Sequence, residues 1–256
     1  MTLANRLVDI APYPAVRAYQ LLLVARHDAL LHAIDGSVRP GDVALDIGAY
    51  RGWYADRLAS RVGPQGRVHA VEPNPDAIRA LSAVARHHGQ IRVHEVAASN
   101  KSGHGQLQRP YVAERRVDAM GSLSNPVVDG LRHDTVDVRL ETVDQLLHDE
   151  VGRVTFIKCD VEGHEQEVLE GATHLIEQSR PVIVVEIEQR HRGRPIEETF
   201  SWLAERGYQG QYVVRNEVRP LSEFDLFRDQ LQYVTTPLYA GRPHRDYVSD
   251  FLFFPR

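Results

Sequence analysis

The chain has 256 residues, and its 35 acidic and 30 basic side chains give a formal net charge of −5 at pH 7. This length allows one domain with a full core, and the lack of a long basic run argues against a nucleic-acid-binding protein. Cys159 is the single cysteine, so no internal disulfide can form, and no apolar run suits a signal peptide or a membrane span. We therefore expect a cytoplasmic protein without a membrane partner.

The first half of the chain alternates between apolar strands and amphipathic helices. Residues 1–37 are predicted to form an amino-terminal helical cap, with helices at 15–26 and 28–34, ahead of a main domain at 38–256. Strands are expected at 43–47, 68–72 and 91–97, with helices at 53–62 and 75–87 between them. This order predicts an α/β fold with a Rossmann-like, doubly wound parallel sheet.

The segment 99–134 interrupts this alternation. It is polar and carries four glycines, so we expect a short hairpin and a mobile loop that form part of an acceptor pocket. Tyr13 and Tyr19 are expected to close over that pocket. The regular pattern then returns, with strands predicted at 136–140, 154–160, 182–187, 211–214 and 251–254, and helices at 142–148, 165–177 and 197–206.

The stretch DVALDIGAYRG, residues 42–52, is typical of a nucleoside-binding turn between a strand and a helix. Gly48 and Gly52 let the backbone approach a ligand, but their spacing does not match the dinucleotide pattern GxGxxG. Asp46 would repel a diphosphate and attract a sulfonium, which favours S-adenosylmethionine over NAD. At the end of the next strand, Glu72 can bind both ribose hydroxyls; the alternative is a carboxylate that caps the following helix. Tyr50 can cover the methionine end with its ring.

A second set of polar residues follows the strand at 154–160. Asp160 ends that strand, at the sheet edge where open α/β sheets bind ligands. Gly163 allows a sharp turn that places His164 at the start of the next helix, where the positive helix end keeps imidazole neutral. A neutral His164 can take a proton from a hydroxyl nucleophile. The alternative, which the residues leave equally open, is a surface histidine in a first helical turn.

Strand-end acids also offer a metal site. Asp160 with Glu186 or Glu188 can hold a hard divalent ion such as Mg²⁺ if the reaction needs one, although acids in these positions more often accept ligand hydrogen bonds. None of the 13 histidines has zinc-site spacing, and His191 is expected at the surface.

Residues 154–188, VTFIKCDVEGHEQEVLEGATHLIEQSRPVIVVEIE, resemble the hallmark block of FkbM-type S-adenosylmethionine-dependent methyltransferases. Residues 40–55 and 138–147 resemble the same family's cofactor loop and its preceding strand and helix. The resemblance implies a class I methyltransferase fold with a seven-stranded sheet, and O-methylation of a small-molecule hydroxyl on a sugar, glycan or polyketide. It also implies site roles: the methionine part lies along Asp46, Gly48 and Gly52, the ribose on Glu72, the adenine beside Ala97, and the methyl-transfer site beside Asp160 and His164.

Three other functions stay open. The acceptor can be an amine rather than a hydroxyl, because a neutral amine needs less help from a base. The chain can be a cofactor-binding scaffold without activity, although such a scaffold would not need Asp160 and His164. A Rossmann oxidoreductase is disfavoured by the glycine spacing and by Asp46. The sequence indicates no oligomeric state.

Overall fold

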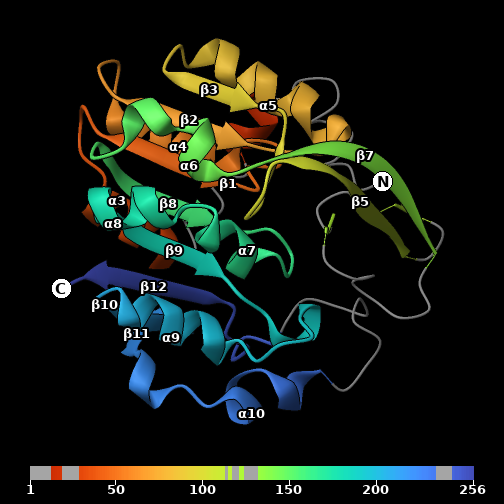
Figure 1. The fold of residues 1–256 in the computed structure, drawn as a ribbon, viewed down its shortest axis with the longest axis vertical. Helices are drawn as coiled ribbons and strands as arrows, with labels where there is room; N and C mark the ends of the chain where they lie inside the picture. The colour runs from red at the N-terminus through yellow and green to blue at the C-terminus, as the bar shows by residue number, and fades with distance from the viewer. Residues whose placement is uncertain (1–12, 19–28, 113–114, 117–120, 124–131, 235–243) are drawn as a thin grey trace.

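The computed structural model describes residues 13–18, 29–112, 115–116, 121–123, 132–234 and 244–256. Its main sheet has eight strands in the order β11-β10-β12-β9-β8-β1-β2-β3 (Figure 1). Their bounds are β1 Val43–Ile47, β2 Arg67–Val71, β3 Ile91–His94, β8 Val154–Cys159, β9 Val182–Glu186, β10 Tyr208–Val214, β11 Glu217–Pro220 and β12 Asp250–Pro255. The doubly wound α/β prediction is confirmed, with one strand more than the seven expected.

The five strands β3, β2, β1, β8 and β9 are parallel, so their carboxyl ends meet at one edge of the sheet. Strand β12 is antiparallel to both β9 and β10, and β10 is antiparallel to the edge strand β11. Every residue of the central strand β1 is buried, as expected for a parallel strand covered on both faces. This burial extends to Asp46, the next-to-last residue of β1.

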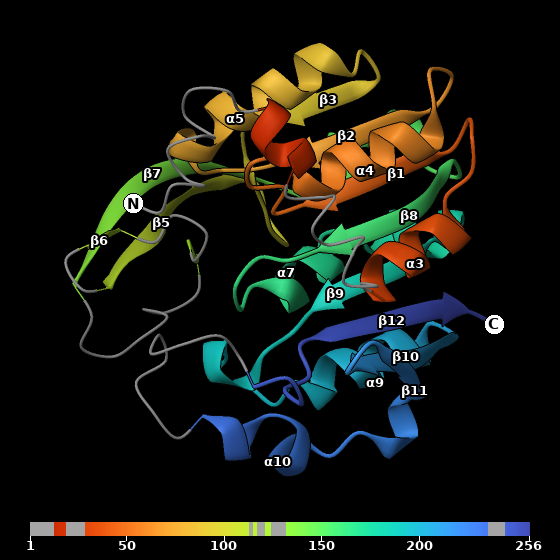
Figure 2. The same ribbon diagram turned by 180° about the vertical axis from the view of Figure 1, so that it is seen from behind.

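Helices cover both faces of the sheet (Figures 1 and 2). One face carries α3 Ala29–Ser37, α4 Trp53–Val62 and α5 Pro75–His87; the other carries α6 Val143–Leu146, α7 Glu165–Glu170, α8 Thr173–Ser179 and α9 Glu197–Glu205. Alternate β1 residues supply the two cores, with Leu45 on the α6–α9 side and Ala44 on the α3–α5 side. Among the described residues, no helix combines the length and apolarity needed to cross a bilayer.

The segment after β3 forms a second, four-stranded sheet in the order β4-β7-β5-β6. Its strands are β4 Ala97–Ala98, β5 Gly103–Val112, β6 Arg115–Arg116 and β7 His133–Glu141. The predicted short hairpin is therefore a long one, in which β5 and β7 pair from Gly103–Leu140 to Pro110–His133 and extend away from the main sheet (Figure 1). Much of the predicted loop, including 124–131, lies outside the described residues.

Two predicted elements differ in their boundaries. The single helix expected at 165–177 is divided into α7 and α8 at Gly171, where a Cβ atom would lie 2.0 Å from the Ser99 carbonyl oxygen. Only glycine fits at this position, because the backbone of the β4 region passes too close for a side chain. The strand expected at 91–97 is also divided, into β3 and β4, which belong to different sheets.

The extra strand β11 follows β10 through a tight turn at Arg215 and Asn216, both with positive φ. Positive φ at both central residues is typical of the type I′ turn, whose twist matches that of the flanking strands. The sequence has no glycine here, which is the usual signal for such a turn. At the other end of the chain, residues 13–18 are helical and α3 extends to Ser37, three residues beyond the prediction. The rest of the predicted cap, 1–12 and 19–28, lies outside the described residues.

Candidate active site

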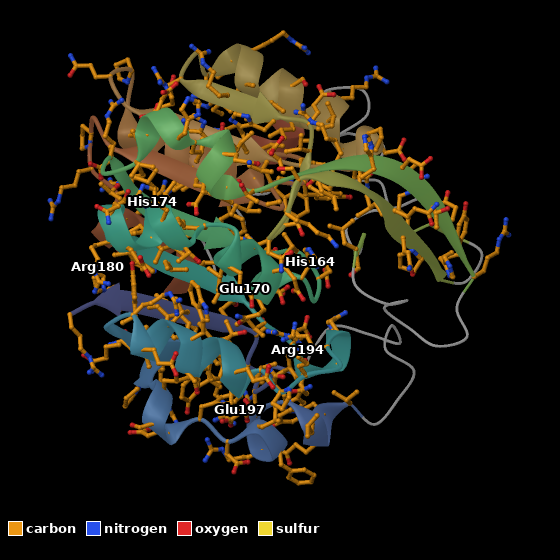
Figure 3. The ribbon with its side chains drawn as sticks, viewed as in Figure 1. His164, Glu170, His174, Arg180, Arg194 and Glu197 are labelled. Carbon is orange, nitrogen blue, oxygen red and sulfur yellow. The ribbon has the colours of Figure 1, made fainter. Side chains whose placement is uncertain are left out.

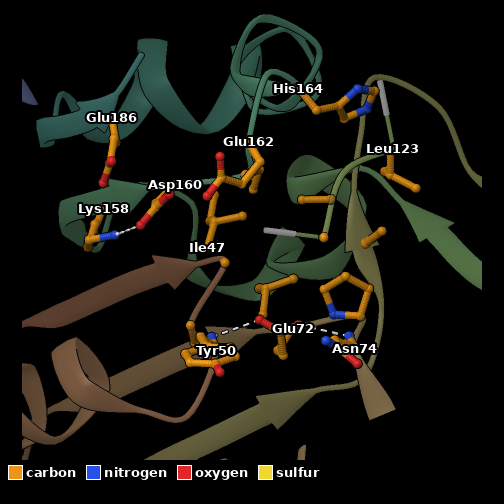
Figure 4. Close-up of a pocket in the computed structure, with 18 of the residues that line it drawn as sticks. Ile47, Tyr50, Glu72, Asn74, Leu123, Lys158, Asp160, Glu162, His164 and Glu186 are labelled. Atoms are coloured by element: carbon orange, nitrogen blue, oxygen red, sulfur yellow. Dashed lines mark hydrogen bonds and ion pairs between the residues drawn. The ribbon is translucent and has the colours of Figure 1, made fainter. Parts of the chain in front are cut away.

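The main pocket opens at the carboxyl edge of the sheet, beside the ends of β1, β2, β8 and β9 (Figure 4). Open α/β sheets bind ligands at this edge, as the sequence predicts. Its wall combines apolar residues, backbone glycines and a group of carboxyl side chains. The lining residues that the argument uses are Gly48, Tyr50, Glu72, Asn74, Ala97, Leu107, Gly121, Leu123, Lys158, Asp160, Glu162, His164 and Glu186.

Gly48 allows the loop after β1 to touch the loop after β8. Its φ is +75°, and a Cβ atom there would lie 1.7 Å from the carbonyl oxygen of Asp160. Tyr50 also has a left-handed backbone, with φ of +47°, and its ring meets that of Trp53 edge to face at 5.6 Å. The loop therefore exposes backbone and one aromatic ring to the main pocket.

Glu72 holds the loops on either side of this end of the pocket. Its two carboxyl oxygens accept hydrogen bonds of 2.7 Å from the backbone N–H groups of Tyr50 and Asn74 (Figure 4). The helix cap of α5 is instead the Asn74 side chain, which accepts from the N–H of Asp76 at 3.1 Å. The alternative role of Glu72 as that cap is wrong. Burial raises the pKa of Glu72 to about 7.

The inner wall holds more carboxyl groups than cationic side chains. Lys158 is buried and its Nζ lies 2.9 Å from Asp160 Oδ2, over the ring of Tyr54. Burial alone would lower the pKa of Lys158, but Asp160 and other nearby carboxylates raise it above its usual range. Asp160 in turn raises the pKa of Glu186 well above normal, and burial does the same for Glu162. One lysine thus faces four pocket acids, counting Glu72.

Two predicted cofactor residues do not line the main pocket. Asp46 is fully buried below it and does not line it. Burial raises the pKa of Asp46 to about 6, while the charge of Lys158 opposes that rise. Gly52, at φ +87°, starts α4 and faces Leu81 and Val84 of α5 in the core. Gly48, Tyr50, Glu72, Ala97 and Asp160 do line the pocket.

His164 lies at the amino-terminal end of α7 and lines the main pocket (Figure 3). Its Nε2 is 3.0 Å from the hydroxyl of buried Ser99, and its Nδ1 is 3.7 Å from a carboxyl oxygen of Glu167. Burial lowers the pKa of His164 below its usual value. The expected neutral state thus follows from burial rather than from the helix end alone.

A small cavity lies next to the main pocket, and we call it the acidic cavity. It is lined by Asp160, Glu162, Gly163, Glu165, Glu186, Glu188 and His191. The metal set predicted from the sequence, Asp160 with Glu186 or Glu188, lies around it. The side chains whose ligand atoms lie within 4.8 Å of one another are, however, Glu162, Glu188 and His191. The surface position expected for His191 is wrong, because its side chain is only 1% exposed.

Three site residues were not predicted from the sequence alone. Lys158 could have been found, because an arginine-rich chain with only two lysines places one inside an apolar strand. Glu162 has a left-handed backbone with φ of +52°, and the hydroxyl of Ser122 donates to its carbonyl oxygen at 2.6 Å. Only the tertiary structure shows that contact, and the same is true of the placement of His191.

Comparison with known proteins identifies the family of this chain. A family model described as the methyltransferase FkbM domain matches residues 46–209, which include both loops that contact at Gly48 and the α7 start. The chain belongs to the FkbM methyltransferase family. The resemblance read from residues 154–188 is thereby confirmed.

Two relatives extend this result. The chain is 30% identical over 151 residues to the hexuronic acid methyltransferase AglP of Haloferax volcanii, a match that covers 57% of this chain and 56% of that protein. The chain thus spans little more than half the length of this curated relative. Its fold is similar to the crystal structure of methyltransferase FkbM from Methylobacillus flagellatus KT, with a TM-score of 0.53 and 18% identity over 84% of this chain and 44% of that one. The class I methyltransferase fold expected from the sequence is confirmed.

Proposed function

We propose that this FkbM-family chain is an S-adenosylmethionine-dependent O-methyltransferase that acts on a hydroxyl of a small carbohydrate. The observation that carries the proposal is the excess of carboxyl groups around the main pocket, where Glu72, Asp160, Glu162 and Glu186 face a single lysine. A bound cation favours the ionised form of such carboxyl groups and is stabilised by it, whereas a diphosphate would be repelled by each group that ionises.

The residues of the pocket fit that donor. Glu72 lies at the end of β2, and each of its oxygens keeps a lone pair after accepting one backbone N–H, so it can still accept from ribose hydroxyls. Ala97 offers an apolar contact for the adenine, and Tyr50 borders the methionine end. Asp46 acts from below the pocket through its charge, because it does not line it.

When bound, S-adenosylmethionine supplies a methyl group on a positively charged sulfur, so the protein has to align the acceptor and remove one proton. We assign proton removal to His164. In the tautomer that donates Nε2–H to Ser99, the lone pair is on Nδ1, and Glu167 at 3.7 Å favours the imidazolium formed there. Asp160, fixed by Lys158, keeps negative charge at the transfer site.

A carbohydrate acceptor is supported by two observations. The outer wall of the main pocket is built by Leu107 of β5 together with Gly121 and Leu123, from the segment predicted to contact the acceptor. The relative AglP acts on a hexuronic acid. Tyr13 stacks on His87 at 3.7 Å and does not line the pocket, and Tyr19 lies outside the described residues.

The proposal is tested by transfer of a labelled methyl group to hexuronic acids and neutral sugars, with the wild type and His164→Ala. Loss of a general base lowers turnover by roughly 10²–10⁴-fold, while donor affinity measured by calorimetry should change less than about twofold. His174→Ala is the matched control, because His174 is an exposed histidine on the next helix, α8 (Figure 3).

Each other outcome has a definite meaning. An equal loss of turnover and donor affinity in His164→Ala would refute its role as the base. Transfer to amines alone would establish the N-methyltransferase alternative. Donor binding without transfer to any acceptor class would favour a scaffold.

A further inference from the structure

The acidic cavity shares part of its wall with the main pocket, since Asp160, Glu162 and Glu186 line both. Its other carboxyl groups, Glu165 and Glu188, are buried. So many acids close together and mostly buried need compensation by cations, hydrogen bonds or protonation. The question is whether the side chains of this cavity provide it.

Three side chains, those of Glu162, Glu188 and His191, bring possible ligand atoms within 4.8 Å of one another. The Nε2 atom of His191 lies 3.5 Å from Glu162 Oε2 and 3.6 Å from Glu188 Oε1. These separations are long for hydrogen bonds. They suit atoms that share one ion, since ligand atoms each about 2.0–2.2 Å from a metal lie roughly 3.0–3.6 Å from one another.

His191 gives an independent indication of a ligand. Its side chain is 1% exposed, and within the described residues neither ring nitrogen makes a hydrogen bond of normal geometry, although Nε2 lies at ion-pair distance from both carboxylates. Buried polar atoms normally have partners, so an imidazole in this state that faces two carboxylates marks a place for a bound group. Gly163 brings the loop against this histidine, since a Cβ there would lie 2.4 Å from the His191 carbonyl oxygen.

Neighbouring residues hold Glu188 in position without using all of its lone pairs. Arg190 Nη2 donates to its Oε1 at 2.8 Å, and the hydroxyl of Tyr247 donates to its Oε2 at 2.5 Å. Each carboxyl oxygen can accept twice, so Oε1 keeps a lone pair on the side of His191. Groups that orient a metal ligand in this way are usual outside the ligand set.

We propose that Glu162, Glu188 and His191 bind a divalent transition-metal ion beside the main pocket. One imidazole and two carboxylates suit Mn²⁺ or Zn²⁺ better than Mg²⁺, which prefers oxygen ligands and several waters. An ion there would favour the ionised form of the carboxyl groups that line both cavities. The proposal is independent of the proposed methyl transfer and of the acceptor.

Metal binding is tested on the full chain, free of any affinity tag and stripped with a chelator. Mn²⁺ is titrated with detection by electron paramagnetic resonance, and Zn²⁺ with detection by thermal unfolding and elemental analysis. We expect one ion per chain, a higher melting temperature with metal, and at least a tenfold weaker affinity in His191→Gln and in Glu162→Gln. His148→Gln is the matched control, because that histidine is exposed and lies 3.0 Å from Asp149.

The alternative is a metal-free cluster in which a protonated His191 is paired with both carboxylates. It predicts no saturable metal binding in the wild type, or equal binding in the wild type and His191→Gln, and either result overturns the proposal. If His191→Gln does not fold, judged by circular dichroism without metal, Glu162→Gln decides, since its partly exposed side chain tolerates the change better. Because neither donor nor acceptor is added, failure here is distinct from failure of the proposed methyl transfer.

Discussion

Glu72 joins two loops at the cofactor end of the main pocket through hydrogen bonds from Tyr50 and Asn74. In Glu72→Gln the amide NH₂ would face a backbone N–H, so one bond is lost and the ribose acceptor is weakened. A charge-assisted hydrogen bond contributes about 1.5–3 kcal/mol, so we expect S-adenosylmethionine to bind roughly 10–100-fold more weakly in calorimetry. Glu95→Gln, at an exposed position near the end of β3, should bind as the wild type does. Unchanged affinity in Glu72→Gln would remove Glu72 from the site.

The pKa of Glu72, about 7 because of burial, gives donor binding a pH dependence. The ionised carboxylate is the better acceptor for ribose hydroxyls, so binding favours ionisation and releases a proton. Affinity should therefore fall as the pH falls through 7, by roughly tenfold between pH 8 and pH 6. Asp46, with a pKa of about 6, adds to the fall at the acidic end.

Calorimetry over this pH range in buffers of different ionisation enthalpy measures both the affinity and the proton release. In Glu72→Gln the pH dependence above pH 7 should disappear. A wild-type affinity that is constant from pH 6 to pH 8 would contradict this account of Glu72.

At the scale of elements, the site depends on the contact between the loops after β1 and β8. Gly48→Ala would place a methyl group 1.7 Å from the Asp160 carbonyl oxygen at a φ of +75°. The left-handed conformation costs about 1–2 kcal/mol and overpacking about 1–3 kcal/mol more. We expect the free energy of unfolding to fall by about 3 kcal/mol, measured by urea denaturation.

Gly89→Ala is the control for this substitution, because a Cβ there meets no atom within 4 Å. Its unfolding free energy should stay within about 0.5 kcal/mol of the wild type. Equal stability of the two variants would mean that the loops do not meet as described.

Element prediction succeeded where local signals agree. Helix α4 ends at a glycine, and α5 starts with Asn74 as its cap and Pro75 in the first turn; both were predicted with the correct bounds. It failed where the local structure depends on residues far away in the sequence or lacks the usual signal. The need for glycine at 171 comes from the Ser99 backbone, and the turn at Arg215 lacks the usual glycine signal. No local sequence pattern predicts either feature.

At the scale of the whole molecule, the parallel half of the sheet could be predicted from the sequence. The contacts between the loops at its carboxyl edge could not. The strand-end rule placed Glu72, Asp160 and His164 on one pocket, because all parallel strands end at the same edge. It wrongly placed Asp46 on the pocket wall, because that residue precedes the edge of the sheet and is fully buried. It missed His191, whose burial depends on the approach of Gly163.

The central claim is that the main pocket holds a sulfonium donor rather than a dinucleotide. Calorimetric titration of the purified chain with S-adenosylmethionine, S-adenosylhomocysteine and NAD tests it most directly. We predict saturable binding of the first two, one molecule per chain, and none of NAD, since Glu72, Asp160, Glu162 and Glu186 face the pocket with one lysine. Tighter binding of NAD than of S-adenosylmethionine would contradict the account.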